Sequence, residues 1–266
     1  MRWIIGDIHG MLRPLEALIA AIPRFDAQPT YYFVGDYVNR GKESKGVIEF
    51  ILSLPNARFI RGNHDDVLDQ VLHGTAYADN ASHGNRFLAM QWFLDHGLLE
   101  TLQSYGATMD MIGQAIINRT PSSLQPIIDL FPPAHRQFIH SLPVFLEDDD
   151  LFLIHGKWPL KQKSGPAKAM KGFGANDSMR QEILWGRFTD AELTKSQSWP
   201  KRGFFGHTPV PTYKGYEGTY KPIVSSKMVL LDTAAALSPS GRLSAYCADN
   251  DQLIQADPQG RLAHPA

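Results

Sequence analysis

Cysteine and long apolar runs are what this sequence has least of. Cys247 is the only cysteine, so no disulfide can form within the chain and the fold does not depend on an oxidising compartment. No window approaches the roughly 18 consecutive apolar residues that a bilayer-spanning helix needs. The apolar run at the N-terminus stops at Asp7, too early for the core of a signal peptide. We therefore expect a cytoplasmic protein that does not enter a membrane.

Net charge is also nearly absent. The chain has 26 Lys and Arg against 27 Asp and Glu, a balance of −1, so bulk electrostatic binding to a nucleic acid duplex is not expected. The charges are unevenly placed, with 13 Lys and Arg against 5 Asp and Glu in residues 151–230. The lysines from Lys157 to Lys171 form either a solvated loop or a positive rim that attracts an anionic substrate.

The remaining composition is that of a folded domain. Hydrophobic residues make up 43% and charged residues 20% of the 266 residues, which excludes collagen-like, coiled-coil and disordered chains. Apolar runs at residues 2–5, 31–34 and 57–60 alternate with segments of helical spacing. The first two runs are followed directly by a glycine and the third by Arg61-Gly62. This alternation predicts a parallel or mixed sheet with helices, in the α/β or α+β class.

The pattern changes in the middle of the chain. Residues 74–142 are mostly helical in their spacing and are interrupted by prolines. We interpret them as a helical insertion in a single domain that spans residues 1–266. Strands are expected again at residues 144–146, 151–154, 204–205, 228–231, 243–248 and 253–255.

Polar residues directly follow the predicted strands. Asp7 and His9 follow the first, Asp36 the second and Asn63 the third, and each loop contains glycine. The carboxyl ends of strands border the ligand crevice in open α/β sheets, so these loops are expected to converge. Two later strand ends add histidines to this set, His155 and His207.

Together these six side chains offer oxygen and nitrogen donors without a thiolate, which suits Mn, Fe, Zn or Co. Two cations that share a carboxylate lie ~3.5–4 Å apart and lower the pKa of a bridging water to about 7, which favours in-line attack on a phosphoester. Each motif alone is weak, and only their joint order is specific. The other histidines have no ligand spacing, so surface or capping roles are expected for His73, His83, His96, His135, His140 and His264.

The order of these motifs resembles the phosphoprotein phosphatase (PPP) branch of the calcineurin-like metallophosphoesterases, above all its bacterial members, a group that includes symmetrical diadenosine tetraphosphatases. The motifs are Gly-Asp-x-His-Gly at 6–10, Gly-Asp-x-Val-x-Arg-Gly at 35–41, Gly-Asn-His-Asp at 62–65, His-Gly at 155–156 and Gly-His-Thr at 206–208. The resemblance extends over residues 2 to about 248. It implies a calcineurin-like metallophosphatase β-sandwich flanked by helices, with the helical insertion described above.

The resemblance also implies two divalent metal ions, with Mn²⁺ expected and Fe, Zn or Co as alternatives. One ion would be held by Asp7, His9 and Asp36. Asp36 would bridge to the second, whose other ligands would be Asn63, His155 and His207.

The remaining roles also come from the resemblance. Arg40 and Arg187, together with Asn63, would bind the phosphate oxygens, since arginine forks match phosphate geometry. A hydroxide between the metals would attack phosphorus in line. His64 would protonate the leaving oxygen as general acid, a role worth ~10²–10⁴-fold in rate.

Asn39 is the main departure from the family pattern. Protein phosphatases of the family usually have an aspartate there that stabilises the imidazolium of the general acid. Asn39 carries no charge, so we expect a lower pKa for His64 than in a carboxylate-paired relative. Diadenosine tetraphosphatases also lack that aspartate, whereas Thr208-Pro209 after His207 fits the protein-phosphatase branch better. Lys157 replaces a usual glycine and points either to the phosphate or to solvent.

These observations favour a metal-dependent phosphoric monoester hydrolase, a Ser/Thr protein phosphatase with phosphotyrosine as a further substrate class. Its partner would be a phosphorylated protein or peptide. The alternative is a symmetrical hydrolase of diadenosine tetraphosphate and other dinucleoside polyphosphates. A binding module without activity is a third hypothesis, against which the complete ligand set argues. Nucleases of the wider superfamily usually have a Gly-His-x-His motif, and its absence here argues against a nuclease.

Overall fold

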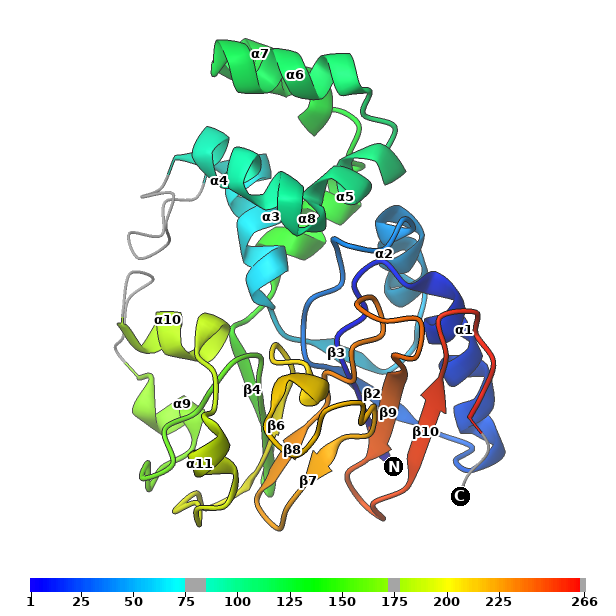
Figure 1. Cartoon of the computed structure of the whole chain (residues 1–266), viewed down its shortest axis with the longest axis vertical. Helices are drawn as coiled ribbons and strands as arrows, with labels where there is room; N and C mark the ends of the chain where they lie inside the picture. The colour runs from blue at the N-terminus through cyan, green and yellow to red at the C-terminus, as the bar shows by residue number, and fades with distance from the viewer. Residues whose placement is uncertain (75–84, 172–177, 264–266) are drawn as a thin grey trace.

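The computed structural model describes residues 1–74, 85–171 and 178–263. Its strands form two five-stranded sheets, as Figure 1 shows. The first has the order β10-β9-β1-β2-β3 and consists of β1 (Arg2–Ile5), β2 (Thr30–Phe33), β3 (Ala57–Phe59), β9 (Leu243–Cys247) and β10 (Leu253–Ala256). The second has the order β4-β5-β6-β8-β7 and consists of β4 (Phe145–Glu147), β5 (Leu151–Ile154), β6 (Arg202–Phe205), β7 (Ile223–Val224) and β8 (Met228–Leu230).

Each sheet contains three neighbouring parallel strands. In the first sheet β1, β2 and β3 run parallel, and in the second β5, β6 and β8 do. The other strands, β9, β10, β4 and β7, pair antiparallel. Parallel neighbours end at the same edge of a sheet, so each sheet brings three strand ends together.

The sheets pack face to face over an apolar layer. Ile4, Tyr32, Leu153, Phe204 and Val229 belong to this layer. Successive side chains of a strand point to opposite faces, and the intervening residues of β1 and β5 pack against helices instead. Both faces of the central strands are therefore buried, which explains why their sequences are continuous apolar runs.

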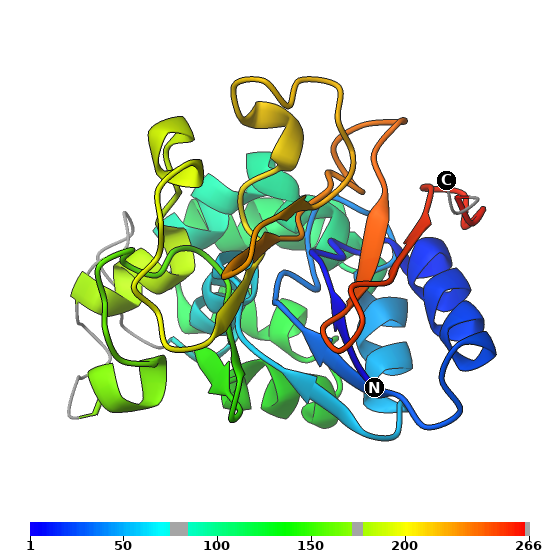
Figure 2. The same cartoon turned by 90° about the horizontal axis from the view of Figure 1, so that it is seen from below.

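Helices cover the outer face of each sheet. The first is covered by α1 (Leu12–Ala21), α2 (Ser44–Leu52) and α3 (Asn63–His73), and the second by α9 (Pro166–Ala169), α10 (Ser178–Trp185) and α11 (Asp190–Leu193). From below, blue α1 and the yellow-green helices lie on opposite sides of the strands (Figure 2). This confirms the predicted β-sandwich flanked by helices.

Within its described residues, the predicted insertion contains five helices and a π-helical segment at Leu94–Leu98. The helices are α4 (Arg86–Phe93), α5 (Leu99–Ser104), α6 (Met109–Asn118), α7 (Pro121–Ile128) and α8 (Pro133–Ser141). Phe93, Leu102 and Phe138 share one apolar cluster with Trp3 of the first sheet, while α6 and α7 lie at the end of the molecule far from the strands (Figure 1). The single-domain interpretation stays a prediction.

The sequence pattern missed two features of the strands. β7 has two residues, too few for a periodic signal. The second is a set of side-chain contacts from the acidic turn between β4 and β5: Tyr32 donates to Asp148 at 2.6 Å, and the guanidinium of Arg2 pairs with Asp150. In the described part of the chain, no helix is long and apolar enough to cross a bilayer.

Arg61 ties the insertion to the sandwich. Its side chain is 3% exposed and pairs at 2.9 Å with both Asp66 and Asp69 of α3. It also donates to the carbonyls of Ile139 and Leu142 at the end of α8. Arg61 therefore balances buried carboxylate charge, with Arg180 as a second cation on Asp66, and terminates a helix.

Arg61→Ala should consequently be severely destabilising. Loss of one partner leaves buried charge uncompensated, which typically costs about 3–5 kcal/mol. The matched control is Arg58→Ala, because Arg58 is 53% exposed and pairs with Asp148, a type of contact worth about 0–1 kcal/mol. Urea denaturation of both variants measures the two free energies of unfolding, and equal values would contradict this role for Arg61.

Candidate metal centre

Six parallel strand ends converge on one buried cluster. Asp7 follows β1, Asp36 follows β2 and Asn63 follows β3, while the second sheet contributes three more residues from the ends of β5, β6 and β8, which are His155, His207 and Asp232. Contacts join the two halves. Asp7 Oδ2 accepts the backbone N–H of His207 at 2.9 Å, and Asn63 Oδ1 lies 3.0 Å from His155 Nε2. The expected convergence of these loops is therefore observed.

Two motif glycines are required by the closeness of these groups. A Cβ at Gly206 would lie 2.0 Å from Asp7 Oδ1, and one at Gly62 would lie 2.1 Å from Asp36 Oδ1. Either contact would displace a carboxylate. The Gly before Asn63 and the Gly before His207 are thus explained by the space that the carboxylates occupy.

The backbone around the cluster is strained. His9, Asp36, Asn39, Arg40 and His207 all have φ between 48° and 73°, a region that costs a non-glycine residue of order 1–3 kcal/mol. Such strain persists only where surrounding contacts over-determine the conformation, as they do at functional sites.

Three histidines each have one ring nitrogen committed to a backbone carbonyl. His9 Nδ1 donates to Val38 at 3.0 Å, His155 Nδ1 to Val34 at 2.8 Å and His207 Nε2 to Trp185 at 3.1 Å. The second nitrogen of each ring then carries the lone pair. It lies 3.4 Å from Asp36 in His9 and 2.9 Å from Asn63 in His207. This is the hydrogen-bonding pattern of metal-ligating histidines.

The carboxylates of the cluster also fit a cation. Asp7 Oδ1 and Asp232 Oδ2 are buried and have no hydrogen-bond partner among the described residues. Burial, followed by the nearby Asp232 charge, raises the pKa of Asp7 well above its usual value. Burial alone would also raise the pKa of Asp36, but His155 and two further histidines hold it well below the usual value. Uncompensated buried carboxylates are normally paired or bound to metal.

The histidine pKa values agree with ligation by neutral rings. Burial first and the Arg40 charge second lower the pKa of His9 to about 3, and burial with His155 lowers that of His207 to about 3. His155 is the exception. Burial opposes its protonation, yet the adjacent Asp36 carboxylate raises its pKa to about 9. A divalent cation on Asp36 would take the place of that proton, because metal binding requires the neutral ring.

His64 is held differently from these three histidines. Its Nδ1 accepts from the Asn39 side-chain Nδ2 at 2.9 Å, and the Thr101 hydroxyl donates to Asn39 Oδ1 at 2.9 Å. The proton of neutral His64 is therefore on Nε2. Burial lowers the pKa of His64 well below its usual value. No backbone carbonyl orients this ring as a ligand in the described structure, which agrees with a separate role.

The predicted phosphate-binding residues lie at the same site. Arg40 Nη1 contacts His9 Nε2, and its Nη2 lies 3.3 Å from His64 Nε2. Arg187 is exposed, and its charge contributes to the lowered pKa of His207. Lys157 takes neither of its two expected directions, because it pairs with Glu192 at 3.1 Å and Glu182 at 3.4 Å. The positive-rim alternative thus loses Lys157, whereas the other lysines of that segment leave it a prediction.

Two buried aspartates of the site, Asp65 and Asp232, have no role in the expectations from the sequence. Asp65 accepts the backbone N–H groups of Asp36, Tyr37 and Gly62 at 2.8 to 3.0 Å and so clamps the second loop to the third. Its place in the Gly-Asn-His-Asp motif was the available signal. Asp232 follows a strand of the second sheet, as the predicted ligands do, and that position alone could have identified it.

A second His–Asp cluster lies between α3 and α8. His73 Nδ1 and His140 Nδ1 lie 2.8 and 3.0 Å from Asp69 Oδ1. Both histidines are exposed, as a surface role predicts, and they share this one carboxylate. Arg61 already balances the charge of Asp69. We therefore interpret this cluster as a structural contact. His83 and His264 lie outside the described residues.

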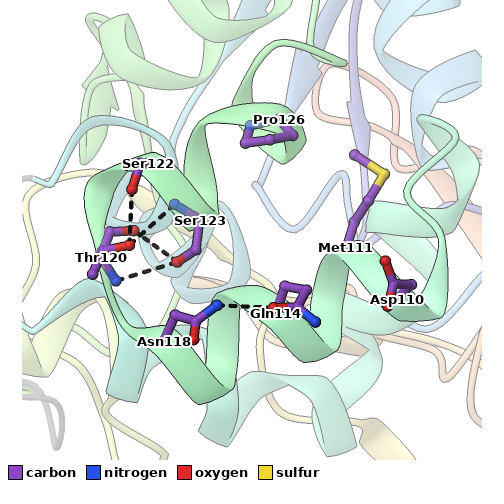
Figure 3. A pocket seen from close by; sticks show the side chains of 8 residues that line it. All are labelled: Asp110, Met111, Gln114, Asn118, Thr120, Ser122, Ser123 and Pro126. Carbon is purple, nitrogen blue, oxygen red and sulfur yellow. Dashed lines mark hydrogen bonds between the residues drawn. The ribbon is translucent and has the colours of Figure 1, made fainter.

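A pocket between α6 and α7 carries no comparable chemistry. Figure 3 shows polar side chains that bond mainly to one another, with Thr120 linked to Ser123 and Asn118 to Gln114. Asp110 is the only carboxylate among its lining residues. The chemistry of this chain is therefore at the strand ends and not in this pocket.

Comparison with known proteins agrees with this geometry. The model of the calcineurin-like phosphoesterase family matches residues 2–221. The chain belongs to the calcineurin-like phosphoesterase family. Its clustered Asp and His side chains are of the kind that divalent metals need.

Similar curated proteins are matched over only part of their length. A Marinomonas protein named "Bis(5'-nucleosyl)-tetraphosphatase, symmetrical" is 34% identical over 119 residues, which are 42% of this chain and 43% of that protein. A protein of the same name from Legionella pneumophila strain Corby is 41% identical over 27% of this chain and 26% of its own length. The matched segments thus span less than half of each relative.

Solved structures share the fold at low identity. One, described provisionally as a diadenosine tetraphosphatase, has a TM-score of 0.55, 19% identity and coverage of 96% of this chain and 92% of its own. The cold-active protein-tyrosine phosphatase of a Shewanella species has a TM-score of 0.53, 15% identity and coverage of 98% and 79%. These likenesses concern the fold alone.

Gly206→Ala should remove metal from a folded protein. The added Cβ would displace Asp7, so we expect about one Mn²⁺ ion fewer per chain by elemental mass spectrometry. Gly113→Ala is the matched control, since no heavy atom lies within 4 Å of its Cβ position in α6, and it should stabilise by about 0.5–1 kcal/mol. Unchanged metal content in the Gly206 variant would refute the assignment of Asp7.

Proposed function

We propose that this phosphoesterase hydrolyses dinucleoside polyphosphates, with diadenosine tetraphosphate as the type substrate and ADP as the product. The observation that carries this proposal is the pairing of His64 with the neutral amide of Asn39. A nucleoside diphosphate is a far better leaving group than a serine alkoxide. It needs less protonation from a general acid, so loss of the usual carboxylate is tolerated.

In this proposal the strand ends would bind two divalent ions, Mn²⁺ first among them. Asp7, His9 and Asp36 would hold one, and Asp36, Asn63, His155 and His207 would hold the second. When bound, such ions supply a nucleophile at neutral pH and stabilise charge on the phosphoryl oxygens. The buried, partnerless Asp7 Oδ1 supports this assignment.

The chain's own residues do the rest. Arg40 binds phosphate oxygens through its guanidinium, which now contacts the lone pair of His9 Nε2 and is held over the site by that contact. Arg187 is exposed at the rim and grips a more distal phosphate, and Asn63 donates to oxygens from its amide. His64 would act as the acid in its imidazolium form, deliver the proton of Nε2, the nitrogen beside Arg40, to the leaving oxygen, and become neutral.

A Ser/Thr protein phosphatase, the function that the sequence motifs favoured, is the second candidate. Thr208-Pro209 after His207 favours it. The names of the curated relatives favour the polyphosphate hydrolase instead. Both candidates use the same metal ligands and differ in the leaving group.

Product analysis separates the two candidates. With Mn²⁺ present, we expect diadenosine tetraphosphate to give ADP at a higher kcat/KM than phosphoserine or phosphotyrosine peptides give orthophosphate. Asp36→Asn is the inactive control, since it removes the shared ligand, and should reduce all turnover to background. Efficient peptide turnover without ADP formation would overturn the proposal and establish the second candidate.

Asn39→Asp tests the role of the His64 pair. A carboxylate would accept a hydrogen bond from His64 Nδ1 and raise the pKa of the ring, so the protonated acid persists to higher pH. Turnover of alkyl phosphates should rise about tenfold or more, and that of nitrophenyl phosphate should change little. Asn56→Asp, the same change at an exposed turn, should affect neither, and a ratio unchanged by Asn39→Asp would exclude His64 as the acid.

A further inference from the structure

Trp92 and Trp185 lie together beside His207 of the candidate metal centre. Trp92 of α4 is 42% exposed, whereas Trp3 and Trp158 are fully buried. Its ring is stacked with that of Trp185 at the end of α10, with centroids 6.0 Å apart and an interplanar angle of 14°. The helices α4 and α10 come from distant parts of the sequence and lie on the same side of the molecule in Figure 1.

Aromatic contacts connect this pair to the site. The Trp185 carbonyl accepts from His207 Nε2 at 3.1 Å, and the two rings lie 6.5 Å apart. Phe93 contacts Trp185 with centroids 6.0 Å apart and His64 with centroids 5.0 Å apart. One aromatic ring thus separates the exposed indole of Trp92 from His64.

A free cation lies next to the pair. Arg187 follows Trp185 by two residues, is exposed, and forms no ion pair or hydrogen bond with any other residue in the described ranges. The charge of Arg187 acts on His207, whose ring also contacts Trp185. A guanidinium and a flat aromatic surface therefore both border His207, and a phosphate joined to a planar ring would match these two groups.

A structural role explains these features less well. Singly exposed apolar side chains are common and need no ligand, but this indole is part of a near-parallel pair that borders an anion site. Aromatic side chains beside cationic groups are the usual platform for nucleobases, because every base offers a π face. We propose that Trp92 and Trp185 form a nucleobase subsite of this enzyme. The inference rests on the proposed function, whose substrates carry a base at each end.

The test compares Trp92 variants on ligands with and without a base. Trp92→Leu keeps apolar bulk but loses the π face, and Trp92→Phe restores it. We expect Trp92→Leu to raise KM for diadenosine tetraphosphate about 10- to 100-fold at little cost to kcat, and Trp92→Phe to recover most of it. KM for inorganic tripolyphosphate should not change. Phe25→Ala, at another exposed aromatic (48%), should leave every value unchanged.

Calorimetric binding of ADP and of pyrophosphate to the Mn²⁺-loaded protein separates this inference from the proposed function. ADP should bind more tightly than pyrophosphate, and Trp92→Leu should abolish the difference. This result supports the subsite even if diadenosine tetraphosphate is not cleaved. Cleavage of the dinucleotide with the same KM in wild type and Trp92→Leu overturns the subsite and leaves the proposed function intact. A raised KM for phosphotyrosine peptide alone also overturns it, because the occupant would then be a peptide aromatic.

Discussion

The conformation of Asp36 is the constraint on which the site depends. Its carbonyl accepts the backbone N–H groups of Ile8 and His9, and its own N–H donates to Asp65. Its Oδ1 accepts the N–H of His64, while its Oδ2 lies 3.3 Å from His155 Nε2. One residue therefore joins loops from three strands of the first sheet to a strand of the second. With 1% exposure and φ of 56°, it stays in place only because all of these contacts agree.

The surroundings of Asp36 hold buried negative charge away from water. Burial of carboxylates is costly unless a cation compensates them. At Arg61 the chain supplies that cation itself, and the resulting cluster is a joint between helices. At the strand ends the chain supplies too few cations for Asp7, Asp36 and Asp232, and the neutral histidines point lone pairs inward instead. The same physics thus distinguishes a structural carboxylate cluster from one built for metal.

Much of this could be predicted from the sequence, because the relevant signals are local. Apolar runs placed β1, β2 and β3, and the polar residues that follow them identified Asp7, Asp36 and Asn63. Contacts between distant segments gave no such signal. The pairing of Trp92 with Trp185 and of Lys157 with two glutamates depends on how helices pack, which no motif encodes. Asp232 was left without a role although it follows a strand, the one local signal that it shares with the predicted ligands.

The Asn39 network limits the chemistry that His64 can perform. The Thr101 hydroxyl accepts from the Asn39 backbone N–H at 2.8 Å and donates its one proton to Asn39 Oδ1 at 2.9 Å, and it lies 2.9 Å from the Ser44 hydroxyl. The Asn39 amide N–H then donates to His64 Nδ1. A nitrogen that accepts this hydrogen bond carries no proton of its own. A general acid at His64 would have to be the imidazolium, and this network stabilises that form poorly. In the proposed function such an acid suits a leaving group that departs as an anion with modest help, so selectivity would rest on phosphate binding and on what lies beyond the phosphate.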